Sequence, residues 1–111
     1  MVTFELKGKC FTVKPKDEKG EYTLDEAKEL CNNLKDGWRI PTLDELRYIF
    51  DVLMNEEKDK LTKEWKFKTK NTNYLTTTMS PDNCPLSFDF NDGRSYLSDE
   101  QFKHKLRLIR D

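Results

Sequence analysis

Two short stretches of the chain gather oxygen-bearing side chains that could suit a hard cation. Asp82 and Asn83 follow a proline, while Asn91 and Asp92 stand between a phenylalanine and a glycine. Carboxylate and amide oxygens are the ligands that calcium prefers. The same residue types are also common turn formers, because they bond to their own backbone and tolerate left-handed conformations. We favour the turn interpretation, so the sequence predicts no metal and no cofactor at these positions.

The residues that could act as nucleophile or base are sparse. Cys84 lies in a predicted loop and is the one candidate nucleophile, whereas Cys31 falls on an apolar helix stripe and Cys10 in a predicted strand. Both of these are expected to be buried. His104, the single histidine, has no paired cysteine or nearby acid in the sequence, and we expect an exposed strand residue. The chain is therefore predicted not to be an enzyme, with oxidase-like or hydrolytic chemistry on Cys84 as the weaker alternative.

A row of lysines offers a different kind of chemistry. Lys66, Lys68 and Lys70 alternate with Trp65 and Phe67, which is a period-two pattern. Proteins that bind single-stranded nucleic acid combine phosphate-binding cations with stacking aromatics in this way. The other interpretation is an edge strand whose lysines discourage aggregation while the aromatics pack inward. Because the formal net charge is only −1, we favour the edge strand and keep nucleic-acid binding as the alternative function.

The composition indicates one folded domain spanning 1–111. A chain of 111 residues has the commonest domain size, and its 12% aromatic content supports a real core despite 37% charged residues. No run approaches the roughly 18 apolar residues of a membrane span, so no membrane insertion is expected. The start lacks a basic segment followed by an apolar one. With an odd number of cysteines, these features predict reduced thiols and a cytoplasmic location.

The tetrapeptide TLDE occurs twice, each time before an apolar-periodic run. Thr23 with Glu26, and Thr42 with Glu45, each fit a capping box that satisfies two backbone donors at a helix start. The first helix should lie on the surface and end at Gly37, while the second carries more apolar positions and should be more enclosed. The repeat is thus a start signal used twice.

Around these helices the sequence predicts strands and turns of an α+β domain. Glycine marks the turn after the first strand, Asn91-Asp92-Gly93 marks a hairpin because these residues tolerate positive φ, and a short third helix is expected around Leu61. The expected strands are Val2–Leu6, Cys10–Lys14, Tyr74–Met79, Leu86–Phe90, Arg94–Leu97 and a final one near His104–Arg110.

The segment joining the helices carries a family resemblance. The residues GWRIPT at Gly37–Thr42, followed by Glu45-Leu46, resemble the GWRLPT..EL pattern of small bacterial C-type-lectin-like domains. These include the Lcl-type C-terminal domain and the major paralogous domains related to it. Weaker landmarks follow in order: YLTTT at Tyr74–Thr78, the Asn91–Gly93 turn and LRLIR at the end. The resemblance covers about residues 22–110.

The resemblance implies a C-type-lectin-like fold. Two helices would flank a twisted antiparallel sheet, the terminal strands would pair, and a long-loop region would carry recognition. The motif itself fits a structural corner, with Trp38 and Ile40 driven into the core and Pro41 setting the direction in which the second helix starts.

The departures from the family pattern also carry expectations. The family often pairs the helix cysteine, here Cys31, with one in the last strand, where this chain has Leu108. Leu75 replaces the tryptophan of the family's YWSST, which alters that part of the core or pocket. The glutamate and tryptophan of the calcium-binding triplets in animal C-type lectins are also missing. Formylglycine-generating oxidases share the implied fold, but they need paired active-site cysteines in a much larger chain.

We therefore predict a non-catalytic binding module that recognises a protein or, as a second option, a glycan. A further hypothesis, drawn from size and the missing leader, is a phage- or mobile-element-encoded protein that acts on a host factor. The binding surface should come from the loops Pro81–Pro85 and Asn91–Asp99, with arginine and tyrosine as natural interface anchors. The predicted binding residues are Asp82, Asn83, Asn91, Asp92, Arg94 and Tyr96.

Overall fold

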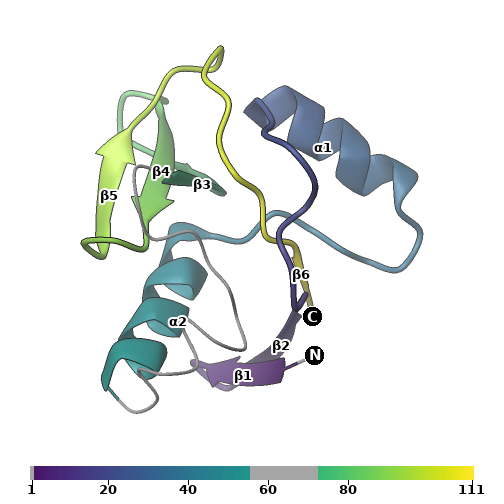
Figure 1. The fold of residues 1–111 in the computed structure, drawn as a ribbon, viewed down its shortest axis with the longest axis vertical. Coiled ribbons are helices and arrows are strands. Elements are labelled where there is room, and N and C mark those ends of the chain that lie inside the picture. The colour runs from purple at the N-terminus through teal and green to yellow at the C-terminus, as the bar shows by residue number, and fades with distance from the viewer. Residues whose placement is uncertain (1, 56–72) are drawn as a thin grey trace.

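The α+β class is confirmed by the computed structural model, which describes residues 2–55 and 73–111 (Figure 1). The expected third helix around Leu61 and the row of Trp65, Lys66, Phe67, Lys68 and Lys70 lie outside the described residues. No helix in the described ranges is long and apolar enough to cross a membrane. In chain order the elements are β1 (Val2–Leu6), β2 (Lys9–Val13), α1 (Leu24–Asn33), α2 (Leu43–Asn55), β3 (Asn73–Met79), β4 (Pro85–Asp89), β5 (Arg94–Leu97) and β6 (Ile109–Arg110).

The strands form two small sheets, β1-β2-β6 and β3-β4-β5, where the resemblance implied one. The β1–β2 hairpin is tighter than expected, because Lys7 and Gly8 both have positive φ (53° and 80°) and Leu6 pairs directly with Lys9. That is the geometry of a two-residue type I′ turn, which matches the twist of the flanking strands. The last strand, β6, pairs with β2 and not with the first strand β1, through Thr12 with Arg110 and Val13 with Ile109.

The β4–β5 hairpin lies where the sequence predicts it, but only one of the three turn residues has the positive φ that the prediction assumed. Among the described non-glycine residues only Lys7 and Asn83 have positive φ, so Asn91 and Asp92 do not. Gly93 alone turns left-handed there, at φ +72°. A Cβ on Gly93 would also lie 2.5 Å from the Phe50 ring of α2. The glycine is therefore required both by its conformation and by the close approach of the helix.

Both capping boxes form. In α1 the amide of Glu26 donates to Thr23 Oγ1 at 3.2 Å, and the Thr23 amide donates to the Glu26 carboxylate at 2.9 Å. In α2 the corresponding distances are 3.2 and 2.7 Å. The expected end of α1 at Gly37 is wrong, because the helix ends at Asn33 and the next residue is already extended. Gly37 is left-handed, at φ +79°, and turns the chain into the GWRIPT segment.

The core consists of two apolar clusters on opposite faces of the β3-β4-β5 sheet. Neighbouring residues of β3 divide between them, since Tyr74 packs into the first cluster and Leu75 into the second. Helix α2 contributes Leu43, Leu46 and Ile49 to the first cluster, and α1 contributes Leu24 and Ala27 to the second. The two helices therefore flank this sheet, and α2 is the more enclosed one (Figure 1).

The last segment is only partly the strand expected near His104–Arg110. It runs between α1 and the β3-β4-β5 sheet toward the C-terminus (Figure 1), and it pairs in turn with Tyr22 and Tyr74 through isolated bridges before β6 begins. Its Arg107 is fully buried. The guanidinium donates through Nε to Asp17 at 2.8 Å and through Nη1 to the Lys14 carbonyl at 3.1 Å. Asp17 also accepts the Tyr74 hydroxyl at 2.7 Å, so the buried charge is neutralised within a network.

Candidate functional site

The GWRIPT segment forms a packed corner. Trp38 is 9% exposed and belongs, with Ile40, to the cluster beneath α1. Its ring lies below two cations, with Lys14 Nζ 5.0 Å and the Arg110 guanidinium 4.6 Å from the centroid. Such cation–π contacts stabilise a partly desolvated indole. The predicted structural role of this segment is confirmed.

Arg39 of the same segment ties the corner to α2. Its guanidinium makes a two-point contact with Glu45, through Nη1 at 2.9 Å and Nη2 at 2.6 Å. It also contacts the Asp111 carboxylate at 2.8 Å. Burial works to raise the pKa of Glu45, but hydrogen bonds from Arg39 and the Thr42 amide outweigh it and lower the pKa below its usual value. The Glu45 hydrogen bonds in turn raise the pKa of Arg39.

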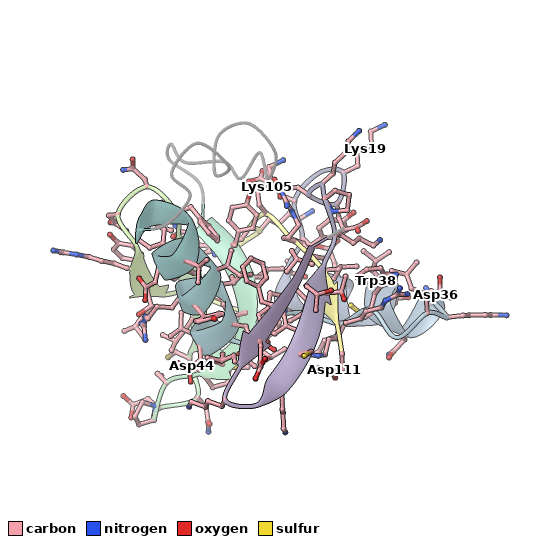
Figure 2. The ribbon with its side chains drawn as sticks, turned by 90° about the horizontal axis from the view of Figure 1, so that it is seen from below. Lys19, Asp36, Trp38, Asp44, Lys105 and Asp111 are labelled. Carbon is pink, nitrogen blue, oxygen red and sulfur yellow. The ribbon has the colours of Figure 1, made fainter. Side chains whose placement is uncertain are left out.

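Two hollows flank Arg39. One, of about 410 Å³, lies against the β1–β2 hairpin; in the view of Figure 2, the labelled Asp44 and Asp111 appear on either side of that ribbon. The residues that line this hollow include two lysines, Lys7 and Lys9, as well as these two acids, so both signs of charge are present. The other, of about 370 Å³, lies beside α1 and includes Cys31. Within residues 2–55 and 73–111, no group of three or more His, Cys, Asp or Glu could hold a metal ion.

The predicted binding residues fall into two groups. Asp82 and Asn83 lie in the turn before β4, and Asn91 and Asp92 in the turn after it. A strand rises about 3.3 Å per residue, so these turns are separated by roughly 17 Å along β4. Asn83 is left-handed, at φ +63°, and its amide donates to the Ser80 carbonyl at 2.9 Å. The structure thus brings together only the second pair with Arg94 and Tyr96.

That second group is organised around Asp92. The Tyr96 hydroxyl donates to Asp92 Oδ2, and the Arg94 amide donates to Asp92 Oδ1 at 2.9 Å. The hydrogen bond from Tyr96 lowers the pKa of Asp92 and raises the pKa of Tyr96. Asp89 accepts the Asn91 amide at 2.7 Å, so both carboxylates serve the turn backbone. Tyr96 and the Arg94 side chain remain exposed.

Exposed apolar side chains occur on the same sheet and in the loop that follows it. In the described part of the chain, the exposed large hydrophobic residues are Met79, Tyr96, Leu97 and Phe102, with Leu97 70% and Phe102 59% exposed. The first three lie on β3 or β5 of the β3-β4-β5 sheet, and Phe102 follows β5 closely. We call Arg94, Tyr96, Leu97 and Phe102 the β5 surface.

His104 helps to hold the segment that carries Phe102. Contrary to the expectation of an exposed residue without partners, it is half-buried, and its Nε2 lies 2.7 Å from Ser98 Oγ. Its backbone also exchanges two 2.9 Å hydrogen bonds with Tyr22. Burial lowers the pKa of His104, while the charge of Glu21 works to raise it. The loop from Ser98 to His104 is therefore closed at its base.

A comparison with protein families matches residues 7–110 to the Lcl C-terminal domain. The match begins in the β1–β2 turn and includes both helices, the GWRIPT corner and the final strand. The chain belongs to the Lcl C-terminal domain family. Among curated proteins, no match was found. Membership of the Lcl family favours a binding or non-catalytic module over an enzyme.

The cysteines of this Lcl-family chain are all free. Cys10 is exposed, so its expected burial is wrong; it lies opposite Glu5, close to the turn of the β1–β2 hairpin. Cys31 is half-buried, and burial raises the pKa of its thiol. Leu108, which stands where the resemblance places the partner cysteine, is fully buried in the cluster that Cys31 packs against. Apolar packing thus stands where the family often has a disulfide.

Three features of the site were missed from the sequence: the Arg39–Glu45 contact, the exposed Leu97 and the exposed Phe102. The Arg39–Glu45 contact had a signal, because both residues belong to the resemblance pattern at Gly37–Leu46. Phe102 had a weaker one, being a lone aromatic within the polar run SDEQFKHK. Leu97 had none, since a strand-end leucine is usually covered.

Proposed function

We propose that this Lcl-family domain is a non-catalytic binding module that recognises a protein partner through the β5 surface. The observation that carries the proposal is the exposure of Tyr96, Leu97 and Phe102, at 42%, 70% and 59%, on β5 and in the loop directly after it. Exposed apolar groups that gather in one place mark interaction sites more often than single exposed residues do. Tyrosine and arginine are also the side chains that most often anchor protein interfaces.

The remaining options receive less support. A glycan would need free polar groups, whereas Asp89 and Asp92 are engaged by backbone amides of their own turn. Nucleic-acid binding through the Lys66, Lys68 and Lys70 row rests on residues outside the described part. The cytoplasmic setting and the host-factor hypothesis stay predictions from the sequence; the odd cysteine count and Leu108 in place of a cysteine support the first.

The test is affinity capture with matched surface variants. Leu97→Asp places a charge where the side chain is already exposed, so folding should be unaffected while an apolar contact is lost. Lys9→Asp is the control, since it adds the same residue at an exposed strand end lining the 410 Å³ hollow. A partner identified with the unaltered chain should bind Leu97→Asp at least about 30-fold more weakly, the size of a hot-spot loss.

Two results decide the matter. Loss with Leu97→Asp and retention with Lys9→Asp supports the β5 surface. Unchanged binding of Leu97→Asp together with loss for Lys9→Asp would move recognition to the hollow beside Arg39 and refute the proposal.

A further inference from the structure

Strand β5 is the outer strand of its sheet. The order is β3-β4-β5, and β5 pairs with β4 through Leu86–Leu97, Ser87–Tyr96, Phe88–Ser95 and Asp89–Arg94. Among residues 2–55 and 73–111, no strand pairs with the other side of β5. Figure 1 shows it at the margin of the molecule, away from α1. Within the described part of the chain, the outer backbone of β5 is therefore open to a partner.

The hydrogen-bond alternation shows which backbone groups point outward. The Ser98 amide donates to the Pro85 carbonyl at 2.8 Å, and this pair continues the β4–β5 register. Residues directly opposite in antiparallel strands alternate between bonded and non-bonded pairs. Ser98 and Tyr96 hence direct their backbone groups toward β4, whereas the Arg94 amide donates to Asp92 Oδ1 in the turn. The N–H and C=O groups of Ser95 and Leu97 point away from the sheet.

This edge carries only part of the usual protection. Natural edge strands are blunted by shortness, charged side chains, proline, bulges or a covering element, and β5 has the first two, being four residues long with Arg94 as its one charge. Strand β5 reads Arg-Ser-Tyr-Leu, its pairing with β4 runs without a register shift, and its last side chain is 70% exposed. Such an edge favours addition of an extended strand, in which backbone hydrogen bonds supply affinity and alternate side chains supply specificity.

The side chains of β5 determine which residues of an added strand would be favoured. Arg94 and Tyr96 share one face of β5, and Ser95 and Leu97 share the other. Arg94 is exposed and forms no ion pair with another described residue, while Asp89 and Asp92 accept hydrogen bonds from turn amides. An added strand would meet the exposed Arg94, whose charge also acts on Asp92, at one end of β5 and the exposed Leu97 at the other.

Resting on the proposed function, we infer that the partner contributes an extended segment that adds antiparallel to β5. Its apolar residue lies opposite Leu97, and its acidic residue, three positions later, lies opposite Arg94. The order follows from the direction of the strand, since Leu97, Tyr96, Ser95 and Arg94 face successive residues of an antiparallel neighbour. The recognised pattern is therefore apolar-X-X-acidic.

The side-chain part of the inference is tested with a random peptide library displayed on phage. Peptides selected on the unaltered domain should be enriched in the apolar-X-X-acidic pattern. Arg94→Glu should weaken their binding about 5-fold, as expected for a cross-strand charge pair, and selection on this variant should enrich basic residues instead. Arg47→Glu is the control. Arg47 is also an exposed arginine, but it lies on α2, and its ion pair with Asp44 is long, at 4.0 Å. No enrichment, or enrichment that Arg94→Glu leaves unchanged, would overturn the inference.

The backbone part needs a change that keeps every side chain. Cys84 allows native ligation of residues 1–83 to a synthetic 84–111 segment carrying an N-methyl group on the Leu97 amide. Because that amide points away from β4, the fold should persist, which thermal unfolding against the unmodified ligated protein verifies. Binding of the selected peptides and of the captured partner should fall at least about 10-fold, the loss of one interface hydrogen bond and its steric fit.

The two proposals fail in distinguishable ways. If Leu97→Asp abolishes partner binding but N-methylation does not change it, the β5 surface binds through side chains and strand addition is refuted. If neither change affects the captured partner, the proposed function itself is refuted.

Discussion

The guanidinium of Arg39 and the carboxylate of Glu45 form a two-point ion pair that joins the GWRIPT corner to the start of α2, with N···O distances of 2.9 and 2.6 Å. The same carboxylate accepts the Thr42 amide at 2.7 Å and so completes the capping box. One glutamate therefore fixes both the helix start and the chain that leads into it. This relationship explains how the motif serves the fold.

Replacing Arg39 with lysine should destabilise the fold by about 1–3 kcal/mol, between the values for surface and buried pairs. Lysine keeps the charge but cannot contact both carboxylate oxygens through a planar fork. Urea unfolding measures the change, and a double-mutant cycle with Glu45→Gln isolates the coupling. Arg47→Lys, at an exposed pair, is the control and should change stability little. A coupling energy of zero would show that the two-point contact contributes nothing.

Acid should unfold the domain partly by protonating Glu45. Its pKa is lowered in the fold relative to the ordinary value, so the folded state binds fewer protons than the unfolded chain. The stabilisation is complete above the unfolded pKa, about 4.3, and is lost as the pH falls through the lower folded pKa. Unfolding free energies measured between neutral pH and pH 3 should fall less steeply in Glu45→Gln. An identical slope in both proteins would contradict this.

His104 should titrate below the usual histidine range. Burial lowers its pKa, so the folded state holds the ring neutral while the unfolded chain binds a proton. Stability from this source is present above the unfolded pKa, about 6.5, and decreases as the pH falls below it. Because the chain has one histidine, its ring resonances in an NMR titration report this pKa without assignment. A midpoint at or above 6.5 would refute the burial argument.

Gly93→Ala should cost more stability than Gly20→Ala. Both glycines are left-handed, at φ +72° and +88°, so alanine pays a backbone cost of about 1–2 kcal/mol at either position. Only at Gly93 would the new Cβ also meet the Phe50 ring, whereas Gly20 has open space. Thermal unfolding of the two variants checks the difference. Equal losses would mean that the Phe50 ring moves aside freely.

The parts of the fold that local chemistry dictates could be predicted from the sequence. Both TLDE boxes start helices because the cap and its acceptor lie three residues apart, and Arg94–Leu97 is a strand because a glycine turn precedes it. The end of α1 was misplaced, since the extended cap at Leu34 ends it before Gly37. Three-dimensional context decided the rest. Neither the burial of Arg107 against Asp17, ninety positions away, nor the exposure of Leu97 has a local signal.

The division of the strands into two sheets also depends on three-dimensional context and could not be predicted from the sequence. The sequence predicted antiparallel strands after the helices, and the resemblance implied paired terminal strands, but nothing in the residues states that β2 and β3 belong to different sheets. The alternation of Tyr74 and Leu75 between the two core clusters was visible only as two adjacent apolar residues. Such a pair indicates a strand buried on both faces but not which helix covers each.

Site-specific photo-crosslinking tests most directly whether recognition lies on the β5 surface and away from the GWRIPT corner. A benzoylphenylalanine at Phe102 replaces an exposed aromatic with a similar one, and the same group at Asp36 reports the surface beside Trp38 (Figure 2). We expect the protein partner to crosslink from position 102 and not from position 36. Crosslinks from position 36 alone would place recognition at the corner and contradict this view of the domain.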